Sequence, residues 1–386
     1  MDTLSDNLKV AFLDVGQGDT IVVSNPTTYE AIVIDCINAN AVLDYLTQEK
    51  IKYLRGILIT HLHSDHFSEV DYLLQRYNLV PGLNECESVG FNQIADKKKD
   101  EYEMLLHDGD DHAFYYERLL EKKHWSRSSS IRTIRQWCKD DKPRFMNPLV
   151  DGVPRPIRFE GDLAQSIYLI HPYALDMPEL YTKGLNNTST ALRISNSHAS
   201  VLLTGDLEPA GWKELRKVKN LESDVLKFPH HGGAWTKEED IDDLLNTVKP
   251  SIVIISVGSK GYNRYKHPNA EVFEALKKHP NIHLLCTQAT NRCHPHVMTQ
   301  QRAVRDLLTI QADKNGQKLI GSKRGCPCAG TIVVELSTSA RVIQPETTFH
   351  QGTIIPNFAN HQCLLRSTVT AAMGGPGEAV KTYAEE

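Results

Sequence analysis

Four potential metal ligands lie within six residues of the sequence, in the run His61-Leu62-His63-Ser64-Asp65-His66. The run follows residues 56–60, an apolar segment that predicts a short buried strand. Because a strand sends alternate side chains to one face, His61 and His63 can bind one ion. The turn that follows then directs Asp65 and His66 toward a second. Imidazole and carboxylate donors favour zinc, manganese or iron(II) over magnesium alone, so the spacing predicts a divalent-metal site.

The elements that must position this run form two β-rich halves. Apolar, β-branched runs at 10–13, 20–23 and 31–34 predict strands, and residues 41–50 have helical spacing. Further strands are predicted at 166–170, 189–194, 200–204, 223–228, 251–257 and 283–286, with a helix over 269–278. Two sets of strands flanked by helices predict an α+β fold in which two sheets pack together.

The segment between the two halves has a different character. Residues 84–156 are charged and mostly helical in pattern, so we interpret them as a helical insertion or cap. The core is then expected over 1–83 and 157–339. Residues 340–386 have little periodicity and contain Gly374-Gly375-Pro376-Gly377, which predicts a C-terminal tail.

Composition limits the class of protein. The 386 residues are 40% hydrophobic and 24% charged, which is ordinary for a globular enzyme. The acidic, polar N-terminus lacks the features of an export signal, and no apolar run approaches the roughly twenty residues of a membrane span. We therefore expect a cytoplasmic protein that does not enter a membrane. The net charge of -5 argues against binding nucleic acid through bulk electrostatics, but bound cations and local basic stretches leave a nuclease open.

The metal-ligand run resembles the signature of the metallo-β-lactamase superfamily, and other segments agree with that family in order. The resemblance implies a four-layer αββα sandwich, here with the helical insertion. It implies that Asp206, in Leu203-Thr204-Gly205-Asp206, bridges two metals. His230 would be the last histidine ligand, with its neighbour His231 as the competing assignment. Asp35 would orient the ligands from behind. The implied ligand set is His61, His63, Asp65, His66, Asp206 and His230.

Several segments further resemble the hydrolase domain of ComEC-type DNA-uptake proteins and its free-standing relatives. They are Phe12-Leu13-Asp14-Val15-Gly16-Gln17-Gly18-Asp19, Thr204-Gly205-Asp206, Pro229-His230-His231-Gly232 and His267-Pro268. The likeness covers residues 10 to about 287 apart from the insertion, and it does not extend to a membrane channel. The glycines of the first segment permit a tight turn that brings Gln17 and Asp19 toward the active-site face, although a simple hairpin turn is the alternative.

The chain departs from the superfamily at one ligand position. Many members have a further metal-binding histidine where this chain has Leu185-Asn186-Asn187-Thr188-Ser189, and the ComEC-like branch is similar in having an Asn-rich segment there. Asparagine is a poor zinc ligand, so Asn187 is expected to support the ligands from outside. Either the first metal has weaker coordination or His171 supplies the missing donor. We therefore expect one or two ions of Zn²⁺ or Mn²⁺.

A second cluster is formed by cysteines. Cys286, Cys293, Cys326 and Cys328 are grouped near the end of the predicted core, where they could hold a structural zinc ion. His294 and His296 are alternative ligands. The simpler interpretation is four independent cysteines, because neither pair has the C-x2-C spacing.

The resemblance favours phosphodiester hydrolysis by a metal-activated water, with DNA, RNA or a nucleotide as the substrate. Asp65 would act at the metal, and His231 or His267 could protonate the leaving group or contact a phosphate. An ester, thioester or lactone hydrolase is the alternative enzyme, and a non-catalytic metal-binding signalling protein is a third possibility.

The insertion offers Arg127, Arg132 and Arg135 with Trp125 and Trp137, so we hypothesise that it selects the substrate. A solvated helical elaboration is the alternative there.

Overall fold

The computed structural model describes residues 7–61, 63–80, 82–83, 89–91, 155–157, 161–172, 176–259, 263–290, 292–293 and 301–355. The predicted insertion, apart from its two ends, lies outside the described residues, as do His294, His296 and the chain beyond residue 355. The hypothesis that Arg127, Arg132 and Arg135 select the substrate therefore stays a prediction.

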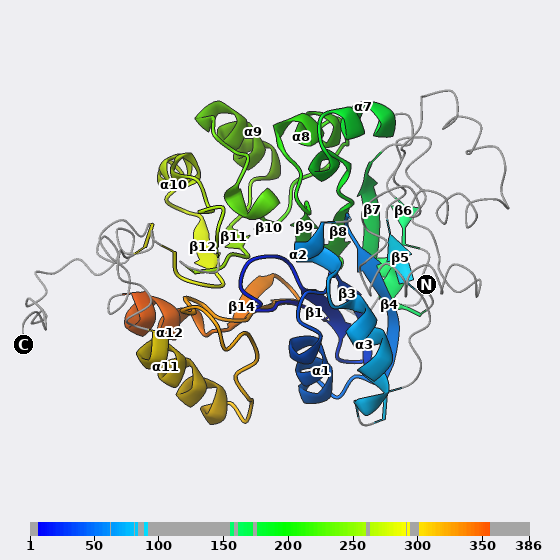
Figure 1. Ribbon diagram of the computed structural model, residues 1–386, viewed down its shortest axis with the longest axis vertical. Coiled ribbons are helices and arrows are strands. Elements are labelled where there is room, and N and C mark those ends of the chain that lie inside the picture. The colour runs from blue at the N-terminus through cyan, green and yellow to red at the C-terminus, as the bar shows by residue number, and fades with distance from the viewer. Residues whose placement is uncertain are drawn as a thin grey trace, which may run out of the picture.

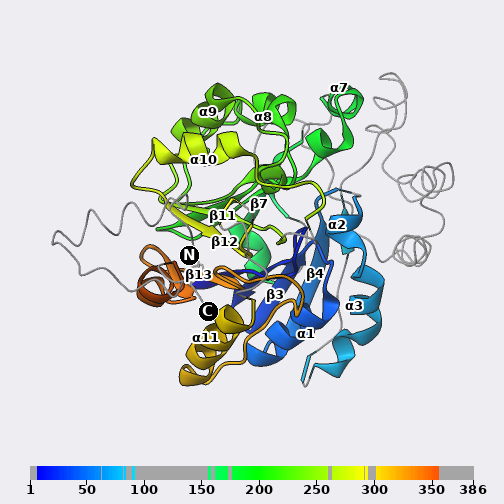
Figure 2. The same ribbon diagram turned by 60° about the vertical axis from the view of Figure 1, so that its left-hand side comes forward.

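Two sheets pack face to face with helices on their outer sides, as Figures 1 and 2 show from two directions. In the described residues each sheet has seven strands. The first has the order β14 (Ala340–Gln344), β13 (Ile332–Leu336), β1 (Leu8–Phe12), β2 (Ile21–Asn25), β3 (Glu30–Ile34), β4 (Tyr53–Ile59) and β5 (Val89–Phe91). The second has the order β12 (His283–Cys286), β11 (Ile252–Ile255), β10 (Val225–Lys227), β9 (Ser200–Leu203), β8 (Ala191–Ser195), β7 (Ile167–His171) and β6 (Arg155–Pro156).

Helices complete the outer layers. On the first sheet they are α1 (Ala39–Gln48), α2 (Ser64–Phe67) and α3 (Val70–Arg76), with α11 (Gln301–Lys314) beside α1. On the second they are α8 (Pro209–Leu215), α9 (Glu238–Val248) and α10 (Ala270–Lys277). The short helices α7 (Met177–Thr182) and α12 (Thr347–Phe349) lie at the periphery. The predicted four-layer αββα sandwich is confirmed.

The central strands are mostly apolar because both of their faces are buried. In β1, Val10 and Phe12 pack between the two sheets, whereas the intervening Ala11 packs under the helices. A strand covered on both sides shows no alternation of polar and apolar residues, so it reads as a continuous apolar run. This pattern allowed the strands to be predicted from the sequence, but it did not indicate which strands pair with one another.

The ends of parallel strands carry the residues that could do chemistry. In the first sheet β3 is parallel to β4, and in the second β9, β10 and β11 are parallel to one another. The carboxyl ends of such strands meet at one edge of a sheet. The predicted ligand run follows β4, Asp206 follows β9 and His230 follows β10, so segments far apart in the sequence lie together at that edge.

The boundaries predicted for the insertion and the tail differ from the structure. The strands β5 and β6, at the two ends of the predicted insertion, are edge strands of the two sheets. The strand β14, placed by the sequence in the tail, pairs with β13 at the opposite edge of the first sheet. An edge strand that is only partly buried, as β14 is, has no clear apolar periodicity, which is why it was missed. Within the described residues, no helix combines the length and apolar character needed to cross a bilayer.

The pairing of β13 with β1 gives a test of the fold. Ile332 is fully buried between the sheets and pairs with Phe12, so Ile332→Ala is expected to lower the free energy of unfolding by about 2–5 kcal/mol. Ile310, on α11, is 52% exposed, and Ile310→Ala should change it by less than about 0.5 kcal/mol. Urea denaturation measures both, and equal effects would contradict the placement of β13.

Candidate metal centre

The predicted ligand run reaches the site from the end of β4 and from α2. His61 Nε2 lies 3.2 Å from His63 Nδ1, so the two rings turn a nitrogen toward the same point. His61 and His66 are buried, whereas His63 and Asp65 are partly exposed and line a cleft. Burial is the main cause that lowers the pKa of His61 and of His63, which keeps both rings neutral and able to bind metal.

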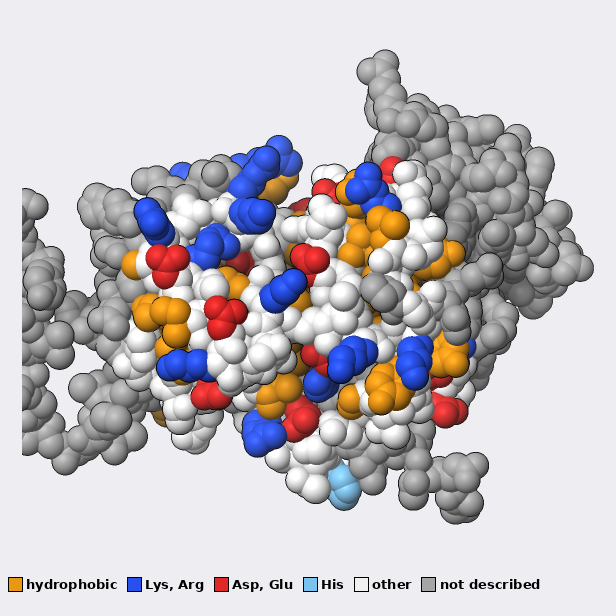
Figure 3. Space-filling view, turned by 90° about the horizontal axis from the view of Figure 1, so that it is seen from below, with side chains coloured by type: hydrophobic (Ala, Val, Ile, Leu, Met, Phe, Trp, Pro, Cys, Tyr) orange, Lys and Arg blue, Asp and Glu red, His pale blue; other side chains and the backbone are white. Residues whose placement is uncertain are grey.

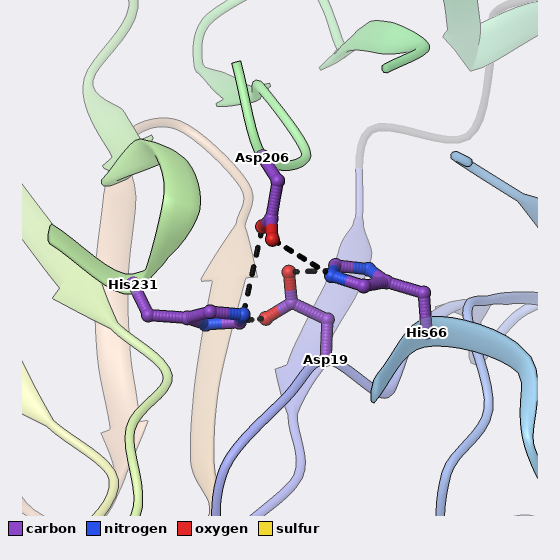
Figure 4. A group of neighbouring side chains, drawn as sticks. All are labelled: Asp19, His66, Asp206 and His231. Atoms are coloured by element: carbon purple, nitrogen blue, oxygen red, sulfur yellow. Dashed lines mark ion pairs between the residues drawn. The ribbon is translucent and has the colours of Figure 1, made fainter. Parts of the chain in front are cut away.

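The carboxylate of Asp206 faces both His66 and His231 (Figure 4). Its Oδ2 is 3.1 Å from Nε2 of His66 and 4.0 Å from Nε2 of His61. The same oxygen is 3.9 Å from Nε2 of His230. Its Oδ1 is 3.5 Å from Nε2 of His231. Burial alone would raise the pKa of Asp206, but His66 and His231 outweigh it and hold the pKa well below the usual range. The carboxylate therefore stays ionised among four imidazoles.

Hydrogen bonds behind the rings orient two of these imidazoles. His66 Nδ1 lies 2.6 Å from Oδ2 of Asp35. The Asp35 carboxylate is itself fixed, because Thr60 N donates to its Oδ1 at 2.8 Å and Thr60 Oγ1 donates to its Oδ2 at 2.7 Å. His231 Nδ1 lies 2.8 Å from the carbonyl oxygen of Ser256. With Nδ1 engaged, each ring directs its Nε2 at Asp206. Such partners fix the ring orientation and raise the basicity of a metal ligand.

A buried lysine that the sequence analysis missed neutralises part of the cluster. Lys227, the last residue of β10, is fully buried; its Nζ forms an ion pair with Asp19, donates to Gly205 O at 3.0 Å and lies 3.7 Å from Asp206 Oδ1. Burial would lower the pKa of Lys227, but Asp19 and Asp206 raise it, so the ammonium stays charged. The only signal in the sequence was a lysine inside an otherwise apolar strand.

Asp19 lies behind the ligand nitrogens. Its donor atom and those of His66, Asp206 and His231 all fall within 4.8 Å of one another, which makes the four a candidate metal group (Figure 4). The ring nitrogens that face Asp19, however, are His66 Nδ1 at 4.0 Å and His231 Nδ1 at 3.9 Å, and both are already hydrogen-bonded elsewhere. Asp19 forms an ion pair with Lys227, so its carboxylate lies behind the metal-facing nitrogens and is not itself a ligand in this arrangement.

The donor set fits a divalent ion. Asp206 Oδ1 and His231 Nε2 are buried, and neither has a hydrogen-bond partner among the described residues. Buried polar atoms in proteins nearly always have a hydrogen-bond partner. Two such atoms that face each other without one therefore indicate a site for a bound ion. Imidazole nitrogens with carboxylates are the donors that zinc and manganese accept.

A cleft of about 260 Å³ opens over the donors. It is lined by His63, Ser64, Asp65, Asn186, Asp206, His230, His231, Tyr265 and His267. The His267 ring is 5.5 Å from that of His230, and burial, followed by His231 and His230, lowers the pKa of His267 to about 4. The predicted candidates His231 and His267 thus differ: His231 faces Asp206, whereas His267 forms part of the cleft wall.

Three other predicted residues lie outside the donor set. Gln17 accepts a hydrogen bond from Gly258 N at 3.3 Å, which ties the glycine-rich turn after β1 to the loop after β11. Asn187 is fully buried, and its Oδ1 accepts a hydrogen bond from Gly211 N in α8 at 2.7 Å. His171 is fully buried with Nδ1 2.9 Å from Ser189 O and is absent from the residues that line the cleft. The structure does not bring His171 to the metal position for which it was considered.

The structure brings the predicted cysteine cluster together only in part. Among the described residues, the only group of three or more potential donors is the one around Asp206. Cys293 and Cys326 pack in a small apolar cluster under α11, Cys286 lies in β12, and Cys328 Sγ is 3.6 Å from His350 Nε2. Cys328 packs against the same cluster as Cys293 and Cys326, and the alternative ligands His294 and His296 lie outside the described residues, so the structural zinc site stays a prediction.

The buried ion pair gives the second test. Lys227→Met removes the cation but keeps the length of the side chain, so it leaves Asp19 buried without its partner. We expect the free energy of unfolding, measured with EDTA present, to fall by about 3–5 kcal/mol. The double variant Asp19→Asn with Lys227→Met should recover part of that loss. A single variant as stable as the unchanged protein, or additive losses in the double variant, would contradict this role.

Comparisons with known proteins agree with the geometry. The chain is 25% identical over 297 residues to ComE operon protein 3 of Bacillus subtilis, covering 72% of this chain and 31% of that protein. It is 38% identical over 105 residues to competence protein ComA of Neisseria gonorrhoeae, covering 26% of this chain and 14% of that protein. The chain thus spans about a third or less of the length of the curated relatives it matches.

Solved structures with a similar arrangement include Igni18, a metallo hydrolase from Ignicoccus hospitalis, at 13% identity and a TM-score of 0.38, covering 72% of this chain and 94% of that one. Another is the metallo-beta-lactamase fold protein YhfI from Bacillus subtilis, at 10% identity and a TM-score of 0.38, covering 73% of this chain and 96% of that one. The family model of the metallo-beta-lactamase superfamily matches residues 13–256. The chain therefore belongs to the metallo-beta-lactamase superfamily.

Proposed function

We propose that this chain is a metal-dependent phosphodiesterase that acts on nucleic acid. The observation that carries the substrate class is the rim of the cleft, where Arg264, Tyr265 and Lys266 are exposed next to His267. Tyr265 is 51% exposed, stacks on His267 with ring centroids 5.6 Å apart, and has the Arg264 guanidinium 4.6 Å from its centroid. Exposed aromatic rings beside cationic side chains are how proteins bind bases and phosphates of a single strand.

The metal would be held by the imidazoles and carboxylates around Asp206. A divalent ion bound there supplies a nucleophile by lowering the pKa of water and stabilises negative charge on the attacked group. The protein orients its donors through Asp35 and Ser256 and holds Asp206 ionised. Asp65 lines the cleft beside His63, where its carboxylate can accept a proton or bind metal, and His267 is placed to contact a phosphate oxygen.

The net charge of -5 favours local recognition of a polyanion over attraction by overall charge. Figure 3 shows the face on which α1 and α11 lie, where the described Lys and Arg side chains are interspersed with Asp and Glu. Mixed charges of this kind create no strong field for a polyanion. Recognition is therefore assigned to the local rim at 264–267. The same donors would suit an ester, thioester or lactone, but a simple ester or lactone has neither a base to stack on Tyr265 nor a phosphate to pair with Arg264 and Lys266.

The proposal is tested by a substrate panel with Zn²⁺ or Mn²⁺ added. We expect hydrolysis of single-stranded DNA, RNA and bis(p-nitrophenyl) phosphate, and its loss in EDTA. His63→Ala and Asp65→Ala should each lower kcat by at least about 100-fold without lowering the melting temperature of the metal-free protein, because both residues line the open cleft. Faster turnover of a thioester than of any phosphodiester would contradict the proposal.

The rim is tested separately. Tyr265→Ala is expected to raise KM for single-stranded DNA by about 5- to 150-fold, because stacking on an aromatic ring contributes about 1–3 kcal/mol per base. Tyr265→Phe keeps the ring and should keep KM. The kcat/KM for bis(p-nitrophenyl) phosphate should change little, since binding of this small diester does not depend on a neighbouring base. Equal losses on both substrates would indicate damage to the metal site instead of loss of base binding.

A further inference from the structure

His61 and His63 each offer one ring nitrogen to a metal ion, and an ion bound there needs further ligands. In a tetrahedral zinc site with bonds of 2.0–2.1 Å, neighbouring donors are about 3.3 Å apart. The separation of 3.2 Å between His61 Nε2 and His63 Nδ1 fits that geometry. Asp206 Oδ2, 4.0 Å from His61 Nε2, offers a third donor. A tetrahedral site needs a fourth donor, and this chain has Asn186 and Asn187 where many members of the superfamily have a histidine.

His230 is the side chain that reaches this position. Its Nε2 is 3.9 Å from Asp206 Oδ2, the oxygen that faces His61, and 3.3 Å from Nδ2 of Asn186. The ring is 20% exposed and lines the cleft, which leaves it accessible to an ion.

Asn186 and Asn187, in the Asn-rich segment, contact a carboxylate and do not bind metal themselves. Asn186 Nδ2 donates to Glu208 Oε1 at 2.9 Å, and Asn187 Nδ2 donates to Glu208 Oε2 at 3.2 Å. The carboxylate held between them lies 3.5 Å from Nδ1 of His230, on the side of the ring away from Asp206. A carboxylate behind an imidazole is the usual support of a metal-binding histidine. Asn186 and Asn187 thus hold Glu208 beside His230, whose Nε2 remains on the side of Asp206.

The neighbouring histidine faces the other oxygen of Asp206. His230 and His231 have φ values of 50° and 53°, so two successive residues adopt the left-handed conformation and their rings diverge. Ring centroids 6.4 Å apart with an interplanar angle of 63° agree with this divergence. His231 Nε2 lies 3.5 Å from Asp206 Oδ1.

We propose that His230 and His231 bind different ions. The first position is formed by His61, His63, His230 and Asp206, and the second by His66, His231 and Asp206 with Asp65 at its edge. The inference rests on the metal dependence of the proposed function but not on its substrate.

Cobalt binding to the metal-free protein tests this assignment without substrate. Visible absorbance and equilibrium dialysis with Co²⁺ report the number of ions and their coordination. Asparagine is the replacement to use, because it tolerates the left-handed backbone. His230→Asn and His231→Asn should each leave one tightly bound ion where the unchanged chain binds two. His198→Asn, at an exposed histidine remote from the cleft, is the matched control and should bind two.

Double variants decide which ion each histidine binds. His61→Asn with His230→Asn should still bind one ion, because both changes affect the first position. His61→Asn with His231→Asn should bind none. Glu208→Gln should weaken only the first ion, by about 10- to 100-fold, and Asn186→His should restore that ion in the His230→Asn background.

Three results would overturn the inference. In the first, His230→Asn still binds two ions with unchanged affinity. In the second, the double variant of His61 and His230 binds no ion. In the third, the unchanged chain binds a single ion. A melting temperature in EDTA close to that of the unchanged chain shows that each variant is folded. Phosphodiesterase activity with only one bound ion would leave the proposed function standing while this assignment fails. If two ions are bound as expected but no phosphodiester is hydrolysed, the metal assignment stands and the proposed function fails.

Discussion

The buried carboxylate of Asp206 is the constraint on which the rest of the site depends. An ionised carboxylate inside a protein is costly unless opposite charge and hydrogen-bond donors surround it. Asp19 and Asp35 add two more buried carboxylates close by. Lys227 provides one fixed cation on the side of Asp206 Oδ1, and the imidazoles face both oxygens. The remaining need for positive charge is what a divalent ion meets, so the binding of metal and the stability of this region are linked.

The sandwich meets this constraint by bringing strand ends together. The ligand run follows β4 in one sheet, whereas Asp206, Lys227 and the histidine pair come from β9, β10 and the turn after β10 in the other. Gly205, at φ 53°, allows the sharp turn into Asp206, where a Cβ would lie 2.9 Å from that of Ser189. The donors lie on α2 and on the segments that directly follow β4, β9 and β10, so the two sheets position them below the cleft.

Much of this could be predicted from the sequence, and the limits have physical reasons. The fold and the ligand run were accessible because they depend on local patterns, namely apolar strands and histidines two residues apart. Lys227 and Glu208 were missed because their roles depend on contacts between segments: Lys227 meets Asp19 from another sheet, and Glu208 meets Asn186 from another loop. The cysteine site stays a prediction, because Cys293, Cys326 and Cys328 pack together without forming a close donor group among the described residues. The edge strand β14 was missed because its apolar face is too small to show a period.

The most direct test of the metal centre is anomalous diffraction from crystals grown with Zn²⁺ or Mn²⁺, collected on both sides of the absorption edge of the metal. The account predicts two anomalous peaks about 3.5–4 Å apart, on either side of Asp206. One should lie about 2.0–2.2 Å from His61 Nε2, His63 Nδ1 and His230 Nε2, and the other at that distance from His66 Nε2 and His231 Nε2. Peaks bound by Asp19, or no peak within reach of Asp206 in crystals that contain the metal, would contradict it.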